Sequence, residues 1–278
     1  MKILARRAYY VIYDESLEDA LRYASQNDWN AIVPDLGVPR FSPHRYTNTM
    51  RRRLRRLSTD LSVAWGFHAP SPDTNLFTYH PTISQAVIGV LRGCIDFAKD
   101  LSPEATTMVV HAGSHTTFKK AREKEDAFTV QHEGLLKETL SKHLTDLIDY
   151  AVPDVTVAIE NHEWTPLIRG VIQELIPQGL GLCLDIPKLY NADGSLKKDD
   201  LDLFEANADA ISVLHVHDWL PSLGAHQVVG EGKIDFFRDL GVLGKLKKDP
   251  LCVFEVRPRE AAQESLKNFT AMLARPGT

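Results

Sequence analysis

The chain reads VTVAIENHEWTPLIRGVIQELIPQGLGLCLDI over residues 155–186, which is an apolar run, a helical pattern and a second apolar run. The two apolar runs, 155–161 and 180–186, show little alternation of polar and apolar residues, as is typical of strands buried on both faces. Between them, residues 166–176 carry a helical pattern, and Pro177 follows where a helix should stop. A strand, a helix and a strand in this order predict two parallel strands joined by a crossover helix.

The same alternation continues along all 278 residues of the chain. The apolar runs that we expect to form strands span 3–7 or slightly beyond, 31–36, 62–68, 107–113, 155–161, 180–186, 211–218 and 251–256. The helical patterns span 16–26, 46–60, 82–101, 126–152, 166–176, 199–207, 235–248 and 259–273. This strict alternation predicts an α/β fold, a (β/α)8 TIM barrel in which residues 1–278 form a single domain. The alternative is a doubly wound open sheet, but no GxGxxG motif opens the first helix.

Composition narrows the class of protein. Apolar residues make up 44% of the chain and charged residues 25%, as in ordinary globular proteins, and the net charge of −5 argues against a general nucleic-acid-binding surface. No window is long and apolar enough to span a membrane, and the first residues lack the features of a signal peptide. Cys94, Cys183 and Cys252 lie in apolar stretches, so we expect reduced core residues in a cytoplasmic protein.

Residues that can bind a metal ion stand at the ends of six consecutive predicted strands. They are His68, His111, Glu160, Asp185, His215 (followed by His217 and Asp218) and Glu255. Because the carboxyl ends of barrel strands build the active site, we expect these side chains to meet. Their carboxylates would repel one another without a cation, and a mixed set of carboxylates and imidazoles suits Mn, Co, Fe, Zn or, less well, Mg. The alternative is an ion-pair network with Arg257, Lys188 or Arg169.

At these positions the sequence resembles the xylose isomerase-like TIM barrel superfamily, which includes sugar-phosphate isomerases and epimerases and, more distantly, endonuclease IV. The resemblance covers nearly the whole chain. It rests on seven motifs in order: HAP (68–70) followed by Asn75-Leu76, VVHAGSH (109–115), AIENH (158–162), LCLDIPK (182–188), HVHD (215–218), VGEGKIDF (229–236) and VFEVRP (253–258).

The resemblance implies that Glu160, Asp185, His215 and Glu255 hold one divalent metal ion. It also implies an isomerase, an epimerase or a related lyase that converts a small sugar, sugar phosphate or polyol-type hydroxy-carbonyl substrate through an enediolate. Glu160 and Glu255 would then be the catalytic residues, acting as acid and base on opposite faces of the substrate. The residues implied for substrate binding or for a second metal ion are His68, His111, Lys188, His217, His226 and Arg257.

Endonuclease IV provides the alternative function, a zinc phosphodiesterase that acts on abasic DNA. Its additional ligands resemble His68, His111 and His226 here. However, the histidine expected on the sixth strand is Lys188, and the aspartate expected two residues before His226 is Gly224. A three-metal centre is therefore not expected, while a second metal ion at His68, His111 and Glu160 stays open. We expect a small carbohydrate-type partner, not nucleic acid or a membrane, and a homo-oligomer stays open because such barrels often pair through their helices.

Overall fold

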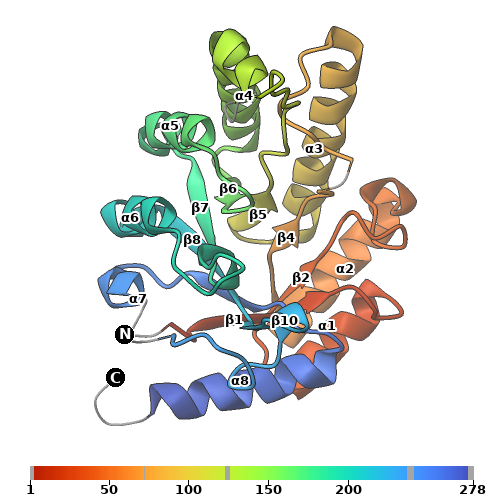
Figure 1. Ribbon diagram of the computed structural model, residues 1–278. Helices are drawn as coiled ribbons and strands as arrows, with labels where there is room; N and C mark the ends of the chain where they lie inside the picture. The colour runs from red at the N-terminus through yellow and green to blue at the C-terminus, as the bar shows by residue number, and fades with distance from the viewer. Residues whose placement is uncertain (1–2, 72, 123–125, 237–240, 275–278) are drawn as a thin grey trace.

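The computed structural model describes residues 3–71, 73–122, 126–236 and 241–274. In this part of the chain, a parallel nine-stranded sheet curves into a nearly closed barrel, and eight α-helices surround it. Figure 1 looks into the ring of helices, with the strands at its centre. The predicted (β/α)8 fold is therefore confirmed. Across the same residues, no helix is long and apolar enough to cross a membrane.

The strands follow one another around the barrel in the order β3, β2, β1, β11, β8, β7, β6, β5, β4. Their bounds are β1 Arg6–Val11, β2 Ala31–Pro34, β3 Ala64–Trp65, β4 Phe67–His68, β5 Thr106–Val110, β6 Val155–Glu160, β7 Gly181–Asp185, β8 Ile211–Val216 and β11 Leu251–Phe254. Strands β3 and β4 are two halves of the strand predicted at 62–68, and they are separated by Gly66. The first half pairs with β2 and the second with β5, while a bridge joins Asp35 to His68. This split strand closes the barrel.

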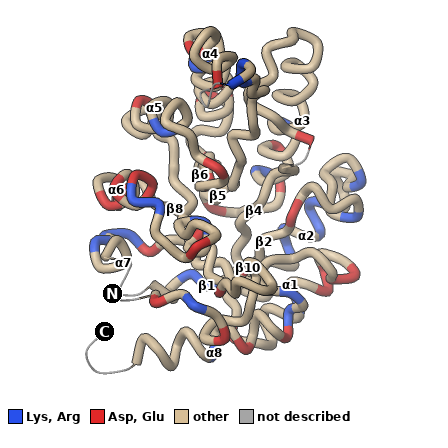
Figure 2. Tube along the Cα trace, viewed as in Figure 1, with Lys and Arg blue, Asp and Glu red and all other residues tan. Residues whose placement is uncertain are grey.

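The helices form the outer layer. Their bounds are α1 Leu17–Gln26, α2 Asn48–Leu61, α3 Pro81–Leu101, α4 Ala127–Ala151, α5 Pro166–Leu175, α6 Lys198–Ala206, α7 Gly241–Lys245 and α8 Arg259–Leu273. Four helices, α1, α2, α4 and α5, begin with a capping side chain that accepts a hydrogen bond from a backbone N–H group. The capping residues are Ser16, Thr47, Asp126 and Thr165. Basic and acidic residues both occur across this layer (Figure 2).

Three predicted elements differ from the structure. The first strand, expected at 3–7 or slightly beyond, is Arg6–Val11, because the chain enters the barrel wall where Arg6 pairs with Leu251, and from Ala8 onward it pairs with β2 as well. The run at 211–218 is not one strand: β8 ends at Val216, and β9 (Asp218–Leu220) forms an antiparallel hairpin with β10 (Gly224–Gln227). The helix expected at 235–248 lies partly outside the described residues; of its described part, α7 (Gly241–Lys245) is helical, whereas 235–236 and 246–248 are not.

Side chains on the strands alternate between the barrel interior and the helical layer. The interior is filled by a compact apolar cluster of Ala8, Tyr10, Ala31, Val33, Val109, Ala158, Cys183, Val213, Leu251 and Val253. Most other buried side chains, Cys94 and Cys252 among them, belong to the larger core between the strands and the helices, and all three cysteines are buried and free as expected. A residue two positions beyond an interior apolar side chain also points to the barrel axis, at the carboxyl end of its strand.

Gly66 shows how tightly the interior is packed. A Cβ atom at this position would lie 2.3 Å from Cδ2 of Leu251 and 3.0 Å from Cγ2 of Val33, both of which are buried. We therefore expect Gly66→Ala to destabilise the protein by about 1–3 kcal/mol through overpacking, as measured by urea unfolding. In a Leu251→Ala background, where the clashing Cδ2 atom is absent, the same glycine substitution should cost less than it does in wild type. Gly89→Ala is the matched control, since Gly89 is exposed on α3 with open space around it and should gain stability. Equal behaviour of both glycines would contradict this packing.

Candidate metal centre

The four side chains expected to hold a metal ion meet at the carboxyl ends of adjoining strands. Glu160 ends β6, Asp185 ends β7, His215 lies in β8, and Glu255 directly follows β11. They follow Ala158, Cys183, Val213 and Val253 of the interior cluster by two residues, so the strand geometry directs each of them to the axis.

The imidazole of His215 lies at the centre of this group. Its Nδ1 atom is 3.3 Å from Oε2 of Glu160, 3.1 Å from Oε2 of Glu255 and 3.8 Å from Oδ2 of Asp185. All four side chains are buried, with at most 9% of any of them exposed. The structure therefore brings three carboxylates and one imidazole to one buried point at the barrel mouth.

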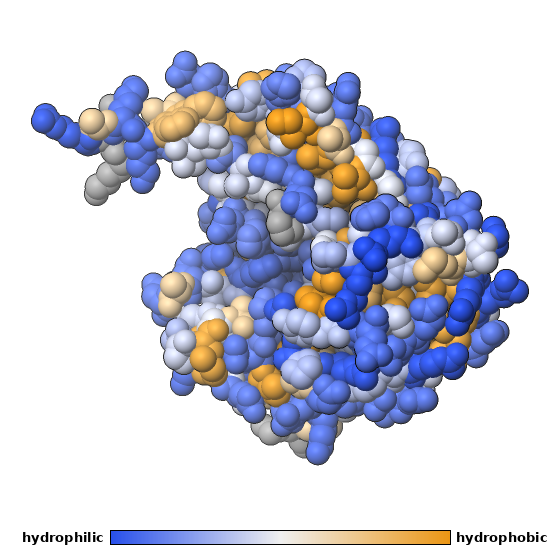
Figure 3. All heavy atoms as spheres, turned by 90° about the vertical axis from the view of Figure 1, so that its right-hand side faces the viewer, coloured by the Kyte–Doolittle hydropathy of each residue, from blue (hydrophilic) through white to orange (hydrophobic). Residues whose placement is uncertain are grey.

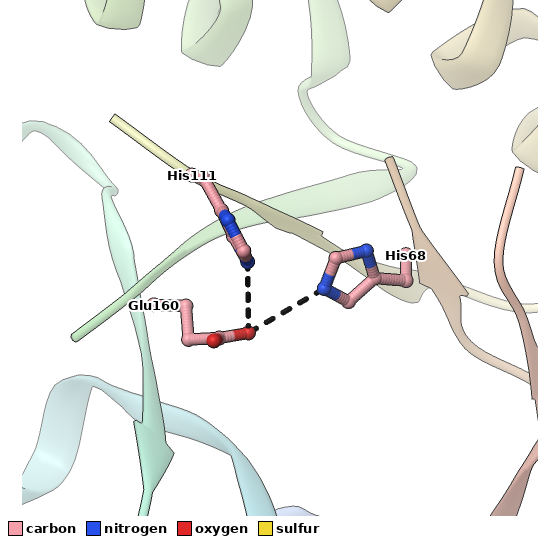
Figure 4. Close-up of side chains that lie close together, drawn as sticks. All are labelled: His68, His111 and Glu160. Carbon is pink, nitrogen blue, oxygen red and sulfur yellow. Dashed lines mark ion pairs between the residues drawn. The ribbon is translucent and has the colours of Figure 1, made fainter. Parts of the chain in front are cut away.

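Two further histidines approach Glu160 from the neighbouring strands. Figure 4 shows the imidazoles of His68 and His111 converging on the Glu160 carboxylate. Their Nε2 atoms lie 3.4 Å and 3.3 Å from its Oε2 atom. Nδ1 of His68 is 2.9 Å from the carbonyl oxygen of Ala69, which can only accept a hydrogen bond, so this nitrogen carries a proton. The Nε2 atom that faces Glu160 is then the one available to a metal ion.

The donor set fits a divalent metal ion. Within the described residues, five buried atoms of these side chains have no hydrogen-bond partner: Nε2 of His111, Oε2 of Glu160, Nδ1 and Nε2 of His215, and Oε2 of Glu255. Buried polar atoms are rarely left without a partner, and metal ions bound among these side chains would supply partners. The ligand atoms of His68, His111 and Glu160 lie within 4.8 Å of one another, and so do those of Asp185, His215 and Glu255. Nitrogen and carboxylate oxygen ligands together suit zinc, manganese, iron or cobalt.

The electrostatics keep the carboxylates ionised. Burial alone would raise the pKa of Glu160, but the Lys188 ammonium and the imidazoles of His215 and His111 hold that pKa well below its usual range. Burial likewise opposes ionisation of Glu255, and the nearby histidines, His215 first among them, lower its pKa to about 2. Ionised carboxylates are the form that binds a cation and accepts a proton.

Lys188 lies on the predicted ligands themselves. Its Nζ atom donates to Oε1 of Glu160 and is 3.2 Å from Oδ2 of Asp185. Burial disfavours the ammonium, but the two carboxylates outweigh this effect and raise the pKa of Lys188. Of the three basic residues considered for an ion-pair network, Lys188 does pair with site carboxylates. Arg169 pairs instead with Asp199 and Asp200.

His217 and His226 stack beside the site with different tautomers. The backbone N–H of His226 donates to Nδ1 of His217 at 2.9 Å, so the proton of the neutral His217 ring is on Nε2, 3.3 Å from Oδ1 of Asp185. A protonated Nε2 has no lone pair for a metal ion, and this geometry favours His217 as a donor that orients Asp185. Nδ1 of His226 is 3.0 Å from the Glu255 carbonyl oxygen, so it carries the proton and leaves Nε2 free.

Arg257 lies to one side of the carboxylates. It lines a pocket of about 350 Å³ together with Tyr10, Tyr13 and Asp14.

Burial lowers the pKa of His226, and the Arg257 charge adds to that shift. The side view of the molecule shows a notch whose walls are mainly hydrophilic (Figure 3).

Two residues, Asn161 and Asp218, have roles that the sequence alone does not reveal. The Asn161 side chain bonds to both the backbone N–H and the carbonyl of Asp185, which fixes the end of β7 beside β6. Asp218 accepts backbone N–H groups of Trp219, Gly230 and Ile234, so it organises the following loop rather than joining the metal group. Both residues stand inside quoted motifs, but a motif alone does not show which neighbour a side chain bonds.

Comparisons with known proteins agree with this architecture. Residues 21–272 match the sequence profile of the xylose isomerase-like TIM barrel family. A D-tagatose 3-epimerase-like protein superposes with a TM-score of 0.73 at 18% identity, covering 96% of this chain and 97% of the other. The 3-keto-D-glucoside 4-epimerase of E. coli gives 0.70 at 12% identity over 96% and 99%. A Thermus thermophilus protein soaked with ZnCl2 gives 0.68 at 19% identity over 98% and 99%. At these identities, the solved structures show the shared fold.

The hydrogen bond from His217 to Asp185 can be tested through metal affinity. We expect His217→Leu to weaken Mn²⁺ or Zn²⁺ binding by about 10- to 100-fold, because Asp185 loses the donor that orients it. His217→Gln keeps an N–H donor on a side chain of similar length and should recover much of the affinity. Isothermal titration calorimetry gives both values, and circular dichroism checks the fold. A complete loss of binding in both variants would indicate instead that His217 is itself a ligand.

Proposed function

The chain belongs to the xylose isomerase-like TIM barrel family, and from this premise we propose that it is a divalent-metal-dependent isomerase or epimerase, or a related lyase, of a small sugar-type hydroxy-carbonyl substrate. The observation that carries the proposal is the convergence of Glu160, Asp185 and Glu255 on Nδ1 of His215 at the barrel mouth. The sugar epimerases with the same fold support the choice of substrate class.

Glu160, Asp185, His215 and Glu255 would hold the metal ion. When bound there, it supplies a Lewis acid that polarises a substrate carbonyl. A second ion at His68, His111 and Glu160 stays part of the hypothesis, because these three residues present ligand atoms within 4.8 Å of one another. The metal's identity and number are therefore quantities to measure.

The proton transfers fall to the two glutamates. Strands β6 and β11 are separated by β7 and β8 in the sheet, so Glu160 and Glu255 approach the axis from different sides. In each glutamate, the Oε2 atom lies near Nδ1 of His215, and the Oε1 atom is the second carboxylate oxygen. An ionised glutamate can remove a proton from the carbon beside the carbonyl, and the other glutamate, after it has taken up a proton from water, can give that proton to the opposite face, which is epimerisation. A single glutamate that relays the proton between two carbons would give isomerisation.

Substrate orientation would come from groups around the carboxylates. The free Nε2 atom of His226 and the guanidinium of Arg257 can bind hydroxyl or carbonyl oxygens. Both belong to the segments that follow β8 and β11, next to Glu255. The interior apolar cluster closes the barrel below the site, so the substrate must approach from the mouth.

Replacing Glu160 by glutamine tests its catalytic role. In excess Mn²⁺, we expect Glu160→Gln to lower exchange of the substrate's carbon-bound hydrogen with deuterated water by about 100-fold or more, because the amide cannot accept the proton. Nuclear magnetic resonance follows the exchange with a panel of ketohexoses that includes D-tagatose, and with 3-keto-glucosides. Glu174→Gln is the matched control, since Glu174 is an exposed residue of α5 that pairs with Lys137 of α4. Unchanged exchange in Glu160→Gln with metal bound would refute the assignment.

A zinc phosphodiesterase of the endonuclease IV type is the second candidate function. The approach of the His68 and His111 imidazoles to the Glu160 carboxylate favours it. Other observations weigh against it. The chain carries a net charge of −5, and two arginines of α2 have structural partners, since Arg51 pairs with Asp100 and Arg55 donates to the carbonyl of Lys99. We expect no cleavage of an abasic-site DNA duplex by the zinc-loaded protein. Cleavage that is lost in His111→Ala would replace the isomerase proposal with this one.

A further inference from the structure

Lys188 places a positive charge inside the group of expected metal ligands. It lies three residues after Asp185, in the short 3-10 helix η3 (Pro187–Leu189). Its Nζ atom donates to Oε1 of Glu160 and is 3.2 Å from Oδ2 of Asp185. Both carboxylates are almost fully buried, with side-chain exposures of 1% and 0%. The ammonium therefore pairs with oxygens that have little access to water.

A divalent cation bound to these two carboxylates would lie close to the ammonium, which contacts Oε1 of Glu160 and Oδ2 of Asp185, while Oε2 of Glu160 faces His215. A carboxylate oxygen binds a metal ion such as zinc at about 2.0–2.2 Å, and an ammonium on the same carboxylates would lie within a few ångströms of that ion. Two positive charges at such a distance repel strongly where water does not screen them. Occupation by one cation must therefore weaken occupation by the other.

The Lys188 side chain is partly open to solvent, whereas the two carboxylates that it contacts are buried. Its side chain is 23% exposed, whereas Glu160 and Asp185 are closed off. The four-carbon stem is flexible, so the ammonium can turn toward the mouth by side-chain rotation. The backbone N–H of Lys188 remains near Oδ1 of Asp185, at 3.3 Å, and this contact does not need the ammonium to stay.

We propose that Lys188 is an internal cation that competes with the metal ion for Glu160 and Asp185 and thereby sets the metal affinity of the site. The inference rests on the metal site proposed above. When the metal ion enters, the ammonium leaves the two carboxylates. When the metal ion leaves, the ammonium returns and offsets their mutual repulsion, so the barrel mouth keeps its structure.

Metal titration of a neutral variant tests the competition. Wild type, Lys188→Met and Lys198→Met are titrated with Mn²⁺ and with Zn²⁺ by calorimetry. We expect Lys188→Met to bind at least about ten-fold more tightly than wild type, because the competing charge is gone. Lys198→Met should match wild type, since Lys198 is an exposed residue at the start of α6.

Thermal unfolding gives a readout that does not depend on the titration. In the presence of a chelator, Lys188→Met should melt below wild type, because Glu160 and Asp185 lose their buried ammonium. Saturating Mn²⁺ should then raise the melting temperature of the variant by more than it raises that of wild type. Lys198→Met should follow wild type in both conditions.

The outcomes distinguish the role of Lys188 from the existence of the metal site. Equal or weaker metal binding by Lys188→Met, with binding by wild type intact, overturns the role of Lys188 and leaves the metal site standing. Absence of Mn²⁺ and Zn²⁺ binding in every protein overturns both the metal site and the competition.

A labelling experiment on the unmodified chain covers the case in which Lys188→Met fails to fold. Wild-type protein is treated briefly with an amine-acylating reagent, with chelator or with Mn²⁺, and mass spectrometry measures the modification of Lys188 against that of Lys198. The proposal predicts several-fold faster modification of Lys188 with Mn²⁺, because the ammonium then faces the mouth. A Lys188 rate that Mn²⁺ leaves unchanged contradicts it.

Discussion

The alternation of side chains along each barrel strand is the constraint on which the site depends. Hydrogen bonding between parallel strands fixes their register, so Asp185 lies beside His215, and His215 beside Val253. A period of two residues then places every second side chain inside the barrel. Small apolar residues such as Ala158 and Cys183 fill the lower interior, and on β5, β6, β7, β8 and β11 the next inward position carries a polar group. The scaffold thereby assembles the polar cluster without help from flexible loops.

Charge is the second constraint on this assembly. Glu160, Asp185 and Glu255 place three carboxylates within reach of one imidazole nitrogen, and at most 9% of any of these side chains is exposed. Such a group is unstable without compensating positive charge. Lys188 supplies one positive charge, and a divalent ion would supply two. The affinity for metal, the identity of the metal and the contact made by this lysine are therefore parts of one electrostatic balance.

The sequence predicts much of this arrangement because its main features are local. A polar residue that directly follows an apolar strand must lie at the barrel mouth, and this identifies His111, Glu160 and Asp185 without knowledge of any contact. Other features depend on neighbours in space. The entry of β1 into the barrel wall is set by pairing with β2 and β11, and the break at Gly66 is set by packing against Leu251.

Contacts between side chains are the least predictable features. The sequence names Lys188 and His217 as candidates for substrate or for a second metal ion. Only the structure shows that the ammonium pairs with Glu160 and Asp185, and that a backbone N–H of the β9–β10 hairpin sets the tautomer of His217. The hairpin itself follows β8 after a single residue, and its strands are too short to give a clear periodic pattern.

The central claim is that the strand-end cluster is a divalent metal site. Its most direct test is the metal content of protein purified without chelator, measured by elemental analysis beside an Asp185→Ala, His215→Ala double variant. The account predicts about one equivalent of Mn, Co, Mg, Fe or Zn in the wild-type chain, or two if His68 and His111 also bind an ion. The variant should lose the ion that Asp185 and His215 hold in wild type. A wild-type chain that holds no metal, even after incubation with each of these ions, would contradict it.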